Sequence, residues 1–314
     1  MTLKGFTTVG DATPLTDISN NIVSFFDYGL LEKGNFINVS VPGTGYYGGL
    51  DYRLRRVNDP RYSGNRVWQA FRQNWVWESG HGAIVNSGDP TYPGVSGIYI
   101  QSGFYPTSTT GVYAYYINHP LGQVVFNNSI AATAIVDVNY SYRYINVTNI
   151  DGLQWFQEVH NNSERSDTQD FIKQSGEYGG LAQNRLQLPA IGIEMVGEGS
   201  FKPYQLGGGQ ISYTSIRFHC VAEDRYTRDS LVDMVRLQND QEFRMYDLNE
   251  ISDSGKFPLD YRGVPISGAF RYPDLATHFE GKGLRLFDIR LESMYSLGSL
   301  FIGTLKCNTE VIVD

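Results

Sequence analysis

The stretch ISYTSIRFHCV, residues 211–221, has the clearest strand pattern in the chain. Apolar and polar residues alternate along it, with Ile216 and Phe218 on one side and Arg217 and His219 on the other. In a β-strand this period of two turns one set of side chains toward a core and the other set toward a polar surface. The stretch therefore predicts a strand that is buried on one face.

A helix is expected directly after this strand, from Thr227 to Asp240. Leu231, Met234 and Val235 recur at the i, i+3, i+4 spacing of one helix face. Thr227 is suited to the N-cap, because its hydroxyl can accept a hydrogen bond from a free backbone N–H of the first turn. The sequence thus places one amphipathic helix over residues 227–240.

Further strand patterns flank this strand and helix, at Ala190–Val196, Gly281–Leu291 and Leu300–Val313. Together they predict an α+β domain over residues 186–314, a sheet with one main helix. Residues 151–185 contain the most polar run of the chain and are expected to form a linker or surface loop. Residues 1–150 combine short apolar runs with many Gly and Pro turns, which predicts a β-rich domain with long loops.

Three closely spaced runs between Gly111 and Val147 predict an antiparallel meander in the first domain. Two of them flank a turn at Asn118–Gly122, and the third extends from Ile135 to Val147. We therefore expect a β-dominated α+β protein, in which an N-terminal antiparallel β domain precedes the α+β domain.

The composition of the 314-residue chain limits the classes of function. Charged residues make up 18% and the formal net charge is −8, so a general nucleic-acid binder, which needs a basic face, is not expected. Cys220 and Cys307 lie in apolar, strand-like runs and are expected to be buried free thiols. No apolar run approaches the roughly 18 residues that cross a bilayer, so no membrane partner is expected.

The sequence contains no recognisable catalytic or metal-binding constellation. The Gly triplet at 207–209 is not followed by the Lys-Ser/Thr of a phosphate loop, and the five His never fall at i, i+4. A calcium loop that starts at Asp247 fails, because its sixth residue is Ser252 and its twelfth is Pro258. Hence we expect no catalytic residue, no metal site, no cofactor and no enzymatic activity.

One segment departs from the acidic average. Residues 51–72 contain six Arg and two Asp, a local net charge of +4, and three of the four Trp lie in it or just after it. Arg and Trp dominate the hot spots of protein interfaces. Three interpretations remain open: a docking patch for an acidic subunit, Arg–phosphate contacts with nucleic acid, or an edge strand with solvated Arg over an aromatic core. The interface candidates of this segment are Arg53, Arg55, Arg56, Arg61, Trp68, Trp75 and Trp77.

Several motifs resemble those of virion structural proteins of contractile-tailed bacteriophages, notably those that infect marine bacteria. The resemblance begins at SFFDYGLL (24–31), followed by GNF (34–36), and it covers most of the chain. It continues through GFYP (103–106), YAYYIN (113–118), PLGQVVF (120–126), YSYRY (140–144), FKPYQLGGGQ (201–210) and GKFPLDYRG (255–263).

The resemblance implies a component of the virus particle. The order of elements in the second half is similar to that of tail-terminator, or tail-completion, proteins of the phage neck, which form a ring that caps the tail tube and joins it to the head connector. The implied partners are copies of the chain itself in a sixfold ring and other neck and tail proteins. The implied location is the virion, assembled in the host bacterial cytoplasm.

Two loops are expected to reach neighbouring subunits of such a ring, Ser200–Gln210 and Ser252–Gly268, with Tyr204, Gln205 and Phe257 as contact residues. Two alternatives remain open. A baseplate or fibre-attachment component would use similar surfaces elsewhere in the particle. A carbohydrate-binding or carbohydrate-degrading β protein, from another class, would need an exposed aromatic platform, for which Trp68–Trp77 is the candidate.

Overall fold

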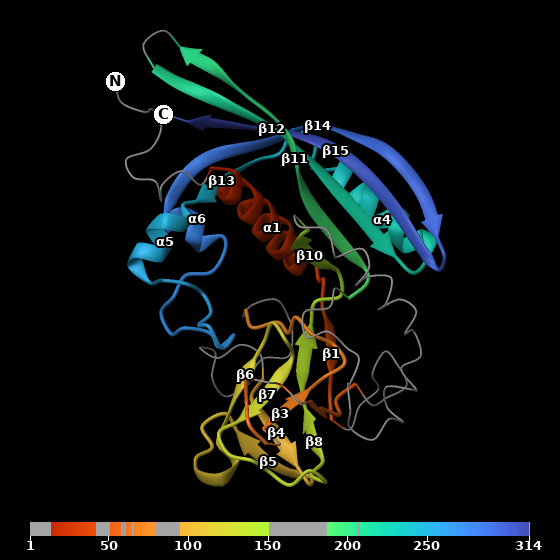
Figure 1. Ribbon diagram of the computed structural model, residues 1–314, viewed down its shortest axis with the longest axis vertical. Coiled ribbons are helices and arrows are strands. Elements are labelled where there is room, and N and C mark those ends of the chain that lie inside the picture. The colour runs from red at the N-terminus through yellow and green to blue at the C-terminus, as the bar shows by residue number, and fades with distance from the viewer. Residues whose placement is uncertain are drawn as a thin grey trace.

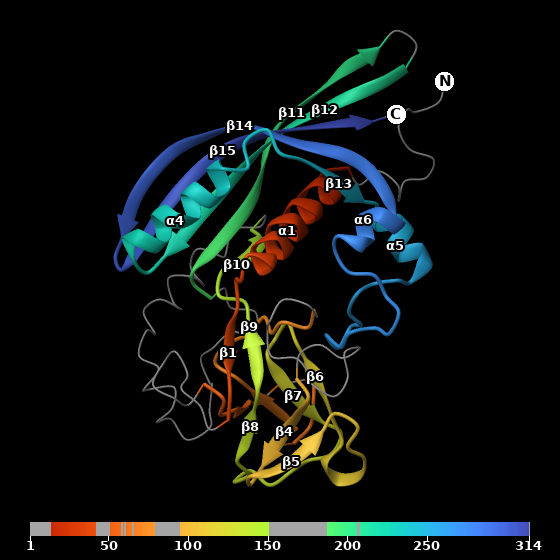
Figure 2. The same cartoon turned by 180° about the vertical axis from the view of Figure 1, so that it is seen from behind.

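The computed structural model describes residues 14–41, 51–57, 59, 61–64, 66–78, 95–150, 187–205 and 208–313. Figures 1 and 2 show two parts of different character. The upper part is a large curved sheet with helices on its inner side, and the lower part is a group of short-stranded sheets. The expected β-dominated fold is confirmed.

The upper part is built on a mixed six-stranded sheet in the order β10-β11-β12-β15-β14-β13. β10 runs parallel to β11, and all other neighbours are antiparallel. Two long hairpins, β11–β12 and β14–β15, supply the four central strands. The strands are β10 (Asn146–Asn149), β11 (Ala190–Gln205), β12 (Gly208–Ala222), β13 (Glu242–Tyr246), β14 (Glu280–Leu297) and β15 (Leu300–Val313).

The pattern that predicted β12 is confirmed by burial. Ile216 and Phe218 are fully buried, whereas Arg217 and His219 are half-buried on the opposite face. The three flanking strands are also confirmed, and β11 and β14 extend well beyond their predicted ends. Cys220 and Cys307 are buried free cysteines, as expected.

Helix α4 (Arg225–Arg236) confirms the predicted helix, but it begins and ends earlier than expected. Its N-cap is Asp224, whose carboxylate accepts a hydrogen bond from the backbone N–H of Thr227 at 2.8 Å. Thr227 therefore lies in the first turn, where its own backbone N–H is the donor that the Asp224 carboxylate satisfies. Leu231 and Val235 are buried against the sheet.

Helix α1 (Pro14–Glu32) lies in the N-terminal part, where a β-rich domain was expected. Ile18, Ile22 and Phe26 recur every four residues and are buried in the core of the six-stranded sheet. The Phe26 ring lies 5.1 Å from the ring of Phe218 in β12, between centroids. Residues 14–32 and 146–149 thus do not belong to the expected antiparallel β domain, because α1 and β10 complete the core of a sheet from the second half of the chain.

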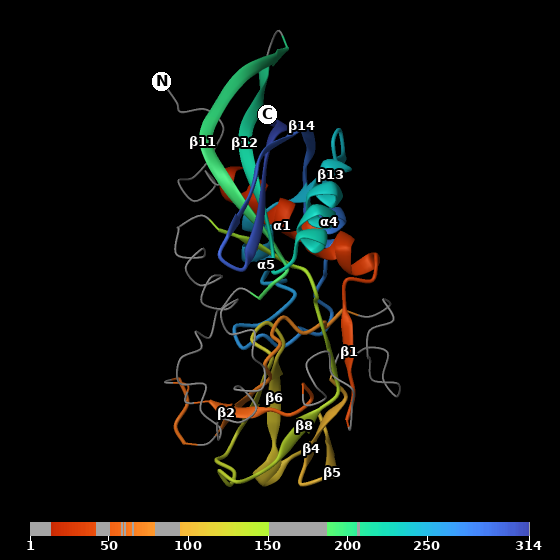
Figure 3. The same ribbon diagram turned by 90° about the vertical axis from the view of Figure 1, so that its right-hand side faces the viewer.

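The lower part holds three small antiparallel sheets, in the orders β2-β3-β7-β6, β5-β4-β8 and β1-β9. Figure 3 shows β1 leading from α1 into this part. Trp75 stacks on Tyr140 in the core, with ring centroids 4.3 Å apart. The elements are β1 (Ile37–Val39), β2 (Arg55–Val57), β3 (Val67–Gln69), β4 (Gly97–Ile100), β5 (Gly103–Pro106), the 3-10 helix η2 (Gly111–Tyr113), β6 (Tyr115–Asn118), β7 (Gln123–Phe126), β8 (Val136–Val138) and β9 (Tyr140–Tyr142).

The predicted meander is correct for two strands and wrong for the third. The β6–β7 hairpin around Asn118–Gly122 is confirmed. The run Ile135–Val147 does not pair with β7. It divides into β8, β9 and the start of β10. β8 pairs with β4, β9 pairs with β1, and β10 pairs with β11. Every residue of β8 and β9 is buried, so the alternation in this run does not mark a strand with one exposed face.

Two short helices, α5 (Leu248–Ser254) and α6 (Asp274–His278), lie between β13 and β14 at the side of the molecule (Figure 1). Asp247, where a calcium loop was considered, is the N-cap of α5 and accepts a hydrogen bond from the N–H of Asn249 at 2.8 Å. The predicted linker, residues 151–185, lies outside the described residues.

Candidate interaction surfaces

Two arginines of residues 51–72 hold carboxylates of their own chain. Arg53 pairs with Asp137, and Nη2 of Arg61 lies 2.7 Å from Oδ2 of Asp59. The Asp59 side chain is fully buried beneath Arg61. Part of the positive charge of this segment is therefore matched locally, which leaves less of it for a partner.

The other arginines of the predicted patch are partly or fully covered. Arg55 and Arg56 are half-buried in β2, the edge strand of its sheet. Arg72 is buried, with its guanidinium carbon 5.1 Å from the centre of the Tyr142 ring. The segment thus does not present its +4 charge as one exposed basic face.

The tryptophans of this region belong mainly to the core. Trp68 is 4% exposed and Trp75 is 1% exposed, while Trp77 is half-buried. The indole N–H of Trp75 donates to the carbonyl oxygen of Arg72 at 2.8 Å. In this fold Trp68 and Trp75 therefore cannot form the aromatic platform that a carbohydrate-binding protein would require.

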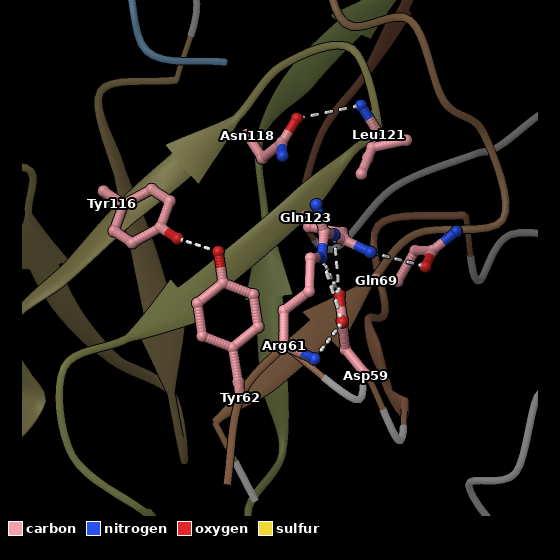
Figure 4. Close-up of polar contacts among 8 residues, drawn as sticks. All are labelled: Asp59, Arg61, Tyr62, Gln69, Tyr116, Asn118, Leu121 and Gln123. Atoms are coloured by element: carbon pink, nitrogen blue, oxygen red, sulfur yellow. Dashed lines mark hydrogen bonds and ion pairs between the residues drawn. The ribbon is translucent and has the colours of Figure 1, made fainter. Parts of the chain in front are cut away.

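A cluster of arginines and tyrosines forms where the Arg-rich segment meets the β6–β7 hairpin, as Figure 4 shows in part. The hydroxyls of Tyr62 and Tyr116 share a hydrogen bond. Arg61 and Arg66 lie 5.6 and 5.7 Å from the Tyr62 ring, and Arg262 lies 5.2 Å from the Tyr116 ring. These distances fit cation–π contacts. We call these five residues the Arg–Tyr cluster.

Hydrogen bonds to neighbouring carboxylates fix two arginines of the Arg–Tyr cluster. The bond to Asp59 is the main cause that raises the pKa of Arg61, and the bond to Asp260 does the same for Arg262. Burial, more than any other factor, raises the pKa of the Tyr116 phenol above its ordinary value. Arg61 and Arg262 are thus held between carboxylates and tyrosine rings of their own chain.

The predicted loop Ser252–Gly268 contacts the same β6–β7 hairpin of its own chain. The backbone N–H and the Nδ1 of His119 donate to the carbonyl oxygen of Gly263 at 3.2 and 3.1 Å. Gly263 has φ +75°, and a Cβ on it would lie 2.6 Å from Oδ1 of Asn118. This part of the loop thus closes the fold, whereas Phe257, at 43% exposure, remains at the surface.

The described residues of the predicted loop Ser200–Gln210 belong to strands β11 and β12 and not to an irregular loop. Figures 1 and 3 show the hairpin of these two strands extending away from the body of the molecule. Phe201 is 59% exposed and Tyr204 is 51% exposed, and the backbone of Gln205 pairs with Gly208. We call residues 199–205 of β11 and 208–213 of β12 the hairpin arm.

A second exposed apolar surface lies at the end of β14. Every residue from Arg290 to Leu297 is exposed, and we call this stretch the β14 end. Its large apolar side chains are between 42% and 45% exposed: Leu291, Met294, Tyr295 and Leu297. It pairs with the first half of β15, whereas the hairpin arm lies along the last residues of β15, so the two surfaces occupy opposite ends of one sheet.

A cavity of about 260 Å³ lies between α1, the α5–α6 segment and the lower part. On its wall, Arg143 reaches two carboxylates from different elements. Nε of Arg143 lies 2.9 Å from Oδ1 of Asp27, and Nη2 donates to Glu78. The Arg143 and Glu78 side chains are buried, and the Asp27 side chain is half-buried.

Burial shifts two pKa values near this cavity in opposite directions. The pKa of Asp27 is raised to about 6, mainly by burial, although the Arg143 charge opposes the shift. The pKa of His119 is lowered to about 4, again mainly by burial. The cavity wall thus contains an acid, Asp27, that binds its proton more tightly than usual. His119, which precedes the wall residue Pro120, has an imidazole that is neutral over most of the pH range.

Asp27, Glu78 and Arg143 were not predicted as a group from the sequence, because the three residues are far apart in the chain. One signal was available. Arg143 stands between Tyr142 and Tyr144 in an aromatic run, and a charge inside such a run indicates a buried, paired group. The Arg–Tyr cluster had no comparable signal, since it depends on the fold of residues 252–268 against β6.

Within the described ranges, His, Cys, Asp and Glu side chains form no group of three that could hold a metal ion. The helices described here include none that is long and apolar enough to span a membrane. A comparison of the sequence with models of known protein families and with curated proteins found no match.

Proposed function

We propose that this chain is a non-catalytic structural protein of a contractile-tailed bacteriophage, and that copies of it form a ring in the neck. In this role it is a tail terminator that joins the tail to the head connector. The sequence motifs quoted above suggest the particle, and the element order of the second half suggests the position. Both suggestions, the particle and the position within it, rest on resemblance. The exposed surfaces of the chain give them independent physical support.

The observation that carries the proposal is the hairpin arm. It extends from the body and keeps Phe201 and Tyr204 more than half exposed. Exposed apolar side chains on a projecting element are unfavourable in a monomer and indicate a surface that a partner covers. A projecting element of this kind lets each copy in a ring reach the next.

The chemistry of the described residues fits binding better than catalysis. The buried charges Asp27, Glu78 and Arg143 satisfy one another, and the cations of the Arg–Tyr cluster stack on phenol rings. Contacts of this kind hold elements together and do not activate a nucleophile. The proposed function therefore uses surfaces, and the cavity wall contributes to stability.

Location in the particle tests this proposal. Antibodies against the chain, coupled to gold, are applied to phage particles that contain it and observed by electron microscopy. We expect gold at the head–tail junction and none on heads or tails that lack the neck. Gold at the distal baseplate would instead support the baseplate alternative and contradict the neck assignment.

The mass of the isolated protein provides a second test. A sixfold ring of a 35.3 kDa chain has a mass of roughly 210 kDa, which native mass spectrometry resolves from other ring sizes. A twelvefold mass would point to a connector and a threefold mass to a fibre attachment, and both would contradict a tail terminator.

A further inference from the structure

We infer that the cavity between α1, the α5–α6 segment and the lower part binds a small organic cation, of the class of an aliphatic ammonium ion. This site goes beyond the proposed ring, because residues of a single chain line the cavity. Three features support the inference: the charge of the wall, the side chains that line it, and the volume that they enclose.

Asp27 supplies a carboxylate that is open to the cavity. Its side chain is 24% exposed, whereas that of Glu78, on the same wall, is 6% exposed. Among the described residues, Arg143 alone forms an ion pair with Asp27, and the same guanidinium is shared with Glu78. One cation thus faces two carboxylates, so a second cation beside Asp27 would balance the charge of the group.

The charges near the tyrosines of the cavity are also mainly negative. Arg271 lines the cavity there, and its positive charge acts on Tyr28. The carboxylates of Glu32 and Asp274 act on the same phenol. Together with the charge group around Arg143, these residues leave an excess of negative charge, which attracts a cationic ligand and repels an anionic one.

Aromatic rings from three parts of the chain line the same cavity. They belong to Tyr28 of α1, Trp77 of the lower part and Tyr272, which precedes α6. The rings of Tyr28 and Tyr272 lie edge to face, with centroids 5.7 Å apart. The face of a ring attracts an ammonium ion that lies within about 6 Å of its centre. These rings therefore favour an organic cation over a neutral molecule of the same size.

The aliphatic part of the wall and the volume set the size of the ligand. Leu248 and Ile251 of α5 and Leu275 of α6 supply apolar surface that suits methylene groups. The cavity of about 260 Å³ has room for about nine water molecules at about 30 Å³ each, and pockets for drug-sized ligands begin at about 300 Å³. The site thus fits an ammonium group on a chain of a few carbon atoms.

Binding of a cation should depend on pH through Asp27. The pKa of Asp27 is about 6, raised mainly by burial, and the cation requires the ionised carboxylate. The affinity should therefore fall about tenfold between pH 7 and pH 5, because the ionised fraction of Asp27 falls by that factor. At pH 6 the free chain holds about half a proton on Asp27, so binding should release about half a proton.

Other titratable groups at the cavity differ from Asp27 in this pH range. His119 has a pKa of about 4, so it is neutral above pH 5. Burial raises the pKa values of three tyrosines that line the cavity, which therefore keep their protons: Tyr28, Tyr246 and Tyr272. Charged groups that line the cavity or act on these tyrosines are Asp17, Glu32, Glu78, Arg143, Arg271 and Asp274. Substitution of Asp27 separates its titration from theirs.

Calorimetric titration of the full chain with n-butylammonium chloride, at pH 7 and constant ionic strength, tests the site. We expect a Kd on the order of 1 mM, which is within reach of a ligand of this size. Butyrate and butan-1-ol have nearly the same shape, with the opposite charge and with no charge. Both should bind at least about tenfold more weakly, because neither offers a cation to Asp27.

The same ammonium group occurs on free amines and on the lysine side chains of other proteins. Titration with Nα-acetyl-lysine N-methylamide distinguishes these two sources. Binding as tight as that of n-butylammonium would support a lysine of a partner as the ligand, since the peptide groups then fit at the mouth. Binding of n-butylammonium alone would support a free amine. Both results support a cation site.

Asp27→Asn should weaken the binding of n-butylammonium at least about tenfold and abolish its pH dependence. The control is Asp137→Asn, because Asp137 is also paired with an arginine, Arg53, and is 11% exposed but does not line the cavity. It should bind as the wild type does. Circular dichroism and thermal unfolding verify that both variants are folded.

Several results would overturn the inference. They are no binding of n-butylammonium at about 50 mM, well above the expected Kd, and binding of butyrate or butan-1-ol that is as tight as that of n-butylammonium. Equal affinity in Asp27→Asn and the wild type would have the same meaning. Proton release needs only the wild-type chain. It is measured at pH 6 as the difference in binding heat between two buffers with different heats of ionisation, and a value near zero would also contradict the site.

Discussion

Arg143 of the lower part reaches Asp27 of helix α1, with 2.9 Å between Nε and Oδ1. The same guanidinium donates to Glu78, so one cation joins two carboxylates from separate elements. A hydrogen bond adds a further link, since the side-chain amide Nδ2 of Asn35 donates to the Ile145 carbonyl oxygen at 2.8 Å. The two parts of the molecule are thus joined through a buried charge group as well as through the chain itself.

Removal of the Arg143 charge should cost much more stability than removal of an exposed arginine. Arg143→Met leaves Asp27 and Glu78 without their cation, and breaking a buried pair in this way costs about 3–5 kcal/mol. The control is Arg285→Met, because Arg285 holds Asp240 at 2.7 Å while both side chains are about half exposed. That loss should be under about 1 kcal/mol. Urea unfolding measures both, and equal losses would contradict the role given to Arg143.

The pH dependence of stability should reveal Asp27. Its pKa is about 6 in the folded chain and 3.8 in its ordinary state, so between these values the folded state binds more protons than the unfolded state. Its contribution to stability is therefore fully present below pH 4 and is lost as the pH rises toward 6. Asp27→Asn should remove this fall in stability. In thermal unfolding from pH 4 to 7, the unfolding temperature of the variant should therefore stay level or rise with pH. A profile parallel to that of the wild type would contradict the assignment.

His119 should have the opposite effect in the same pH range. Its pKa is lowered from 6.5 to about 4, so the folded state binds fewer protons than the unfolded state between these values. Stability from this group is lost as the pH falls from 6.5 toward 4. His119→Asn should therefore make the profile fall more steeply with rising pH than that of the wild type. Asp27→Asn and His119→Asn then bracket the wild-type profile, and two variants that shift it in the same direction would contradict the pair of assignments.

Local sequence patterns were enough to predict the strands and helices that bury one face. The alternation at Ile216 and Phe218 predicted the position of β12, and the spacing of Leu231 and Val235 predicted helix α4. Ile18, Ile22 and Phe26 have an equally regular spacing, which is typical of a helix. The Gly and Pro turns of the following residues are typical of short strands and loops, and this character does not extend back over residues 14–32.

Contacts between distant segments could not be predicted from such patterns. Strands β8, β9 and β10 follow one another in the chain and join three different sheets, a choice that depends on which partner edges are free. The buried state of Trp68 and Trp75 likewise depends on the layer packed over them. Residue type marks Arg and Trp as interface candidates but does not separate a core position from a surface one.

Gly263 should not tolerate a side chain. A Cβ there would lie 2.6 Å from Oδ1 of Asn118 and 2.8 Å from Cδ of Pro120, and the residue has φ +75°. Gly268 is the matched control, because it has φ +72° and a Cβ on it would meet nothing within 4 Å. Gly268→Ala should cost about 1 kcal/mol for the left-handed backbone, whereas Gly263→Ala adds the steric clash and should cost roughly 2–3 kcal/mol more. Chemical unfolding compares them, and equal losses would mean that residues 252–268 can move away from the hairpin without cost.

The hydrogen bond between Tyr62 and Tyr116 should be measurable in a double-mutant cycle. Tyr62→Phe and Tyr116→Phe each remove the same contact, so each should lower the free energy of unfolding by about 0.5–1.5 kcal/mol. The double variant should lose less than the sum of the two, since the contact is already absent in either single variant. Tyr261→Phe is the control, because this tyrosine is 94% exposed and its substitution should be neutral. Additive losses would show that the two phenols are stabilised separately, and the Arg–Tyr cluster would then depend on its three guanidinium groups and not on the link between its rings.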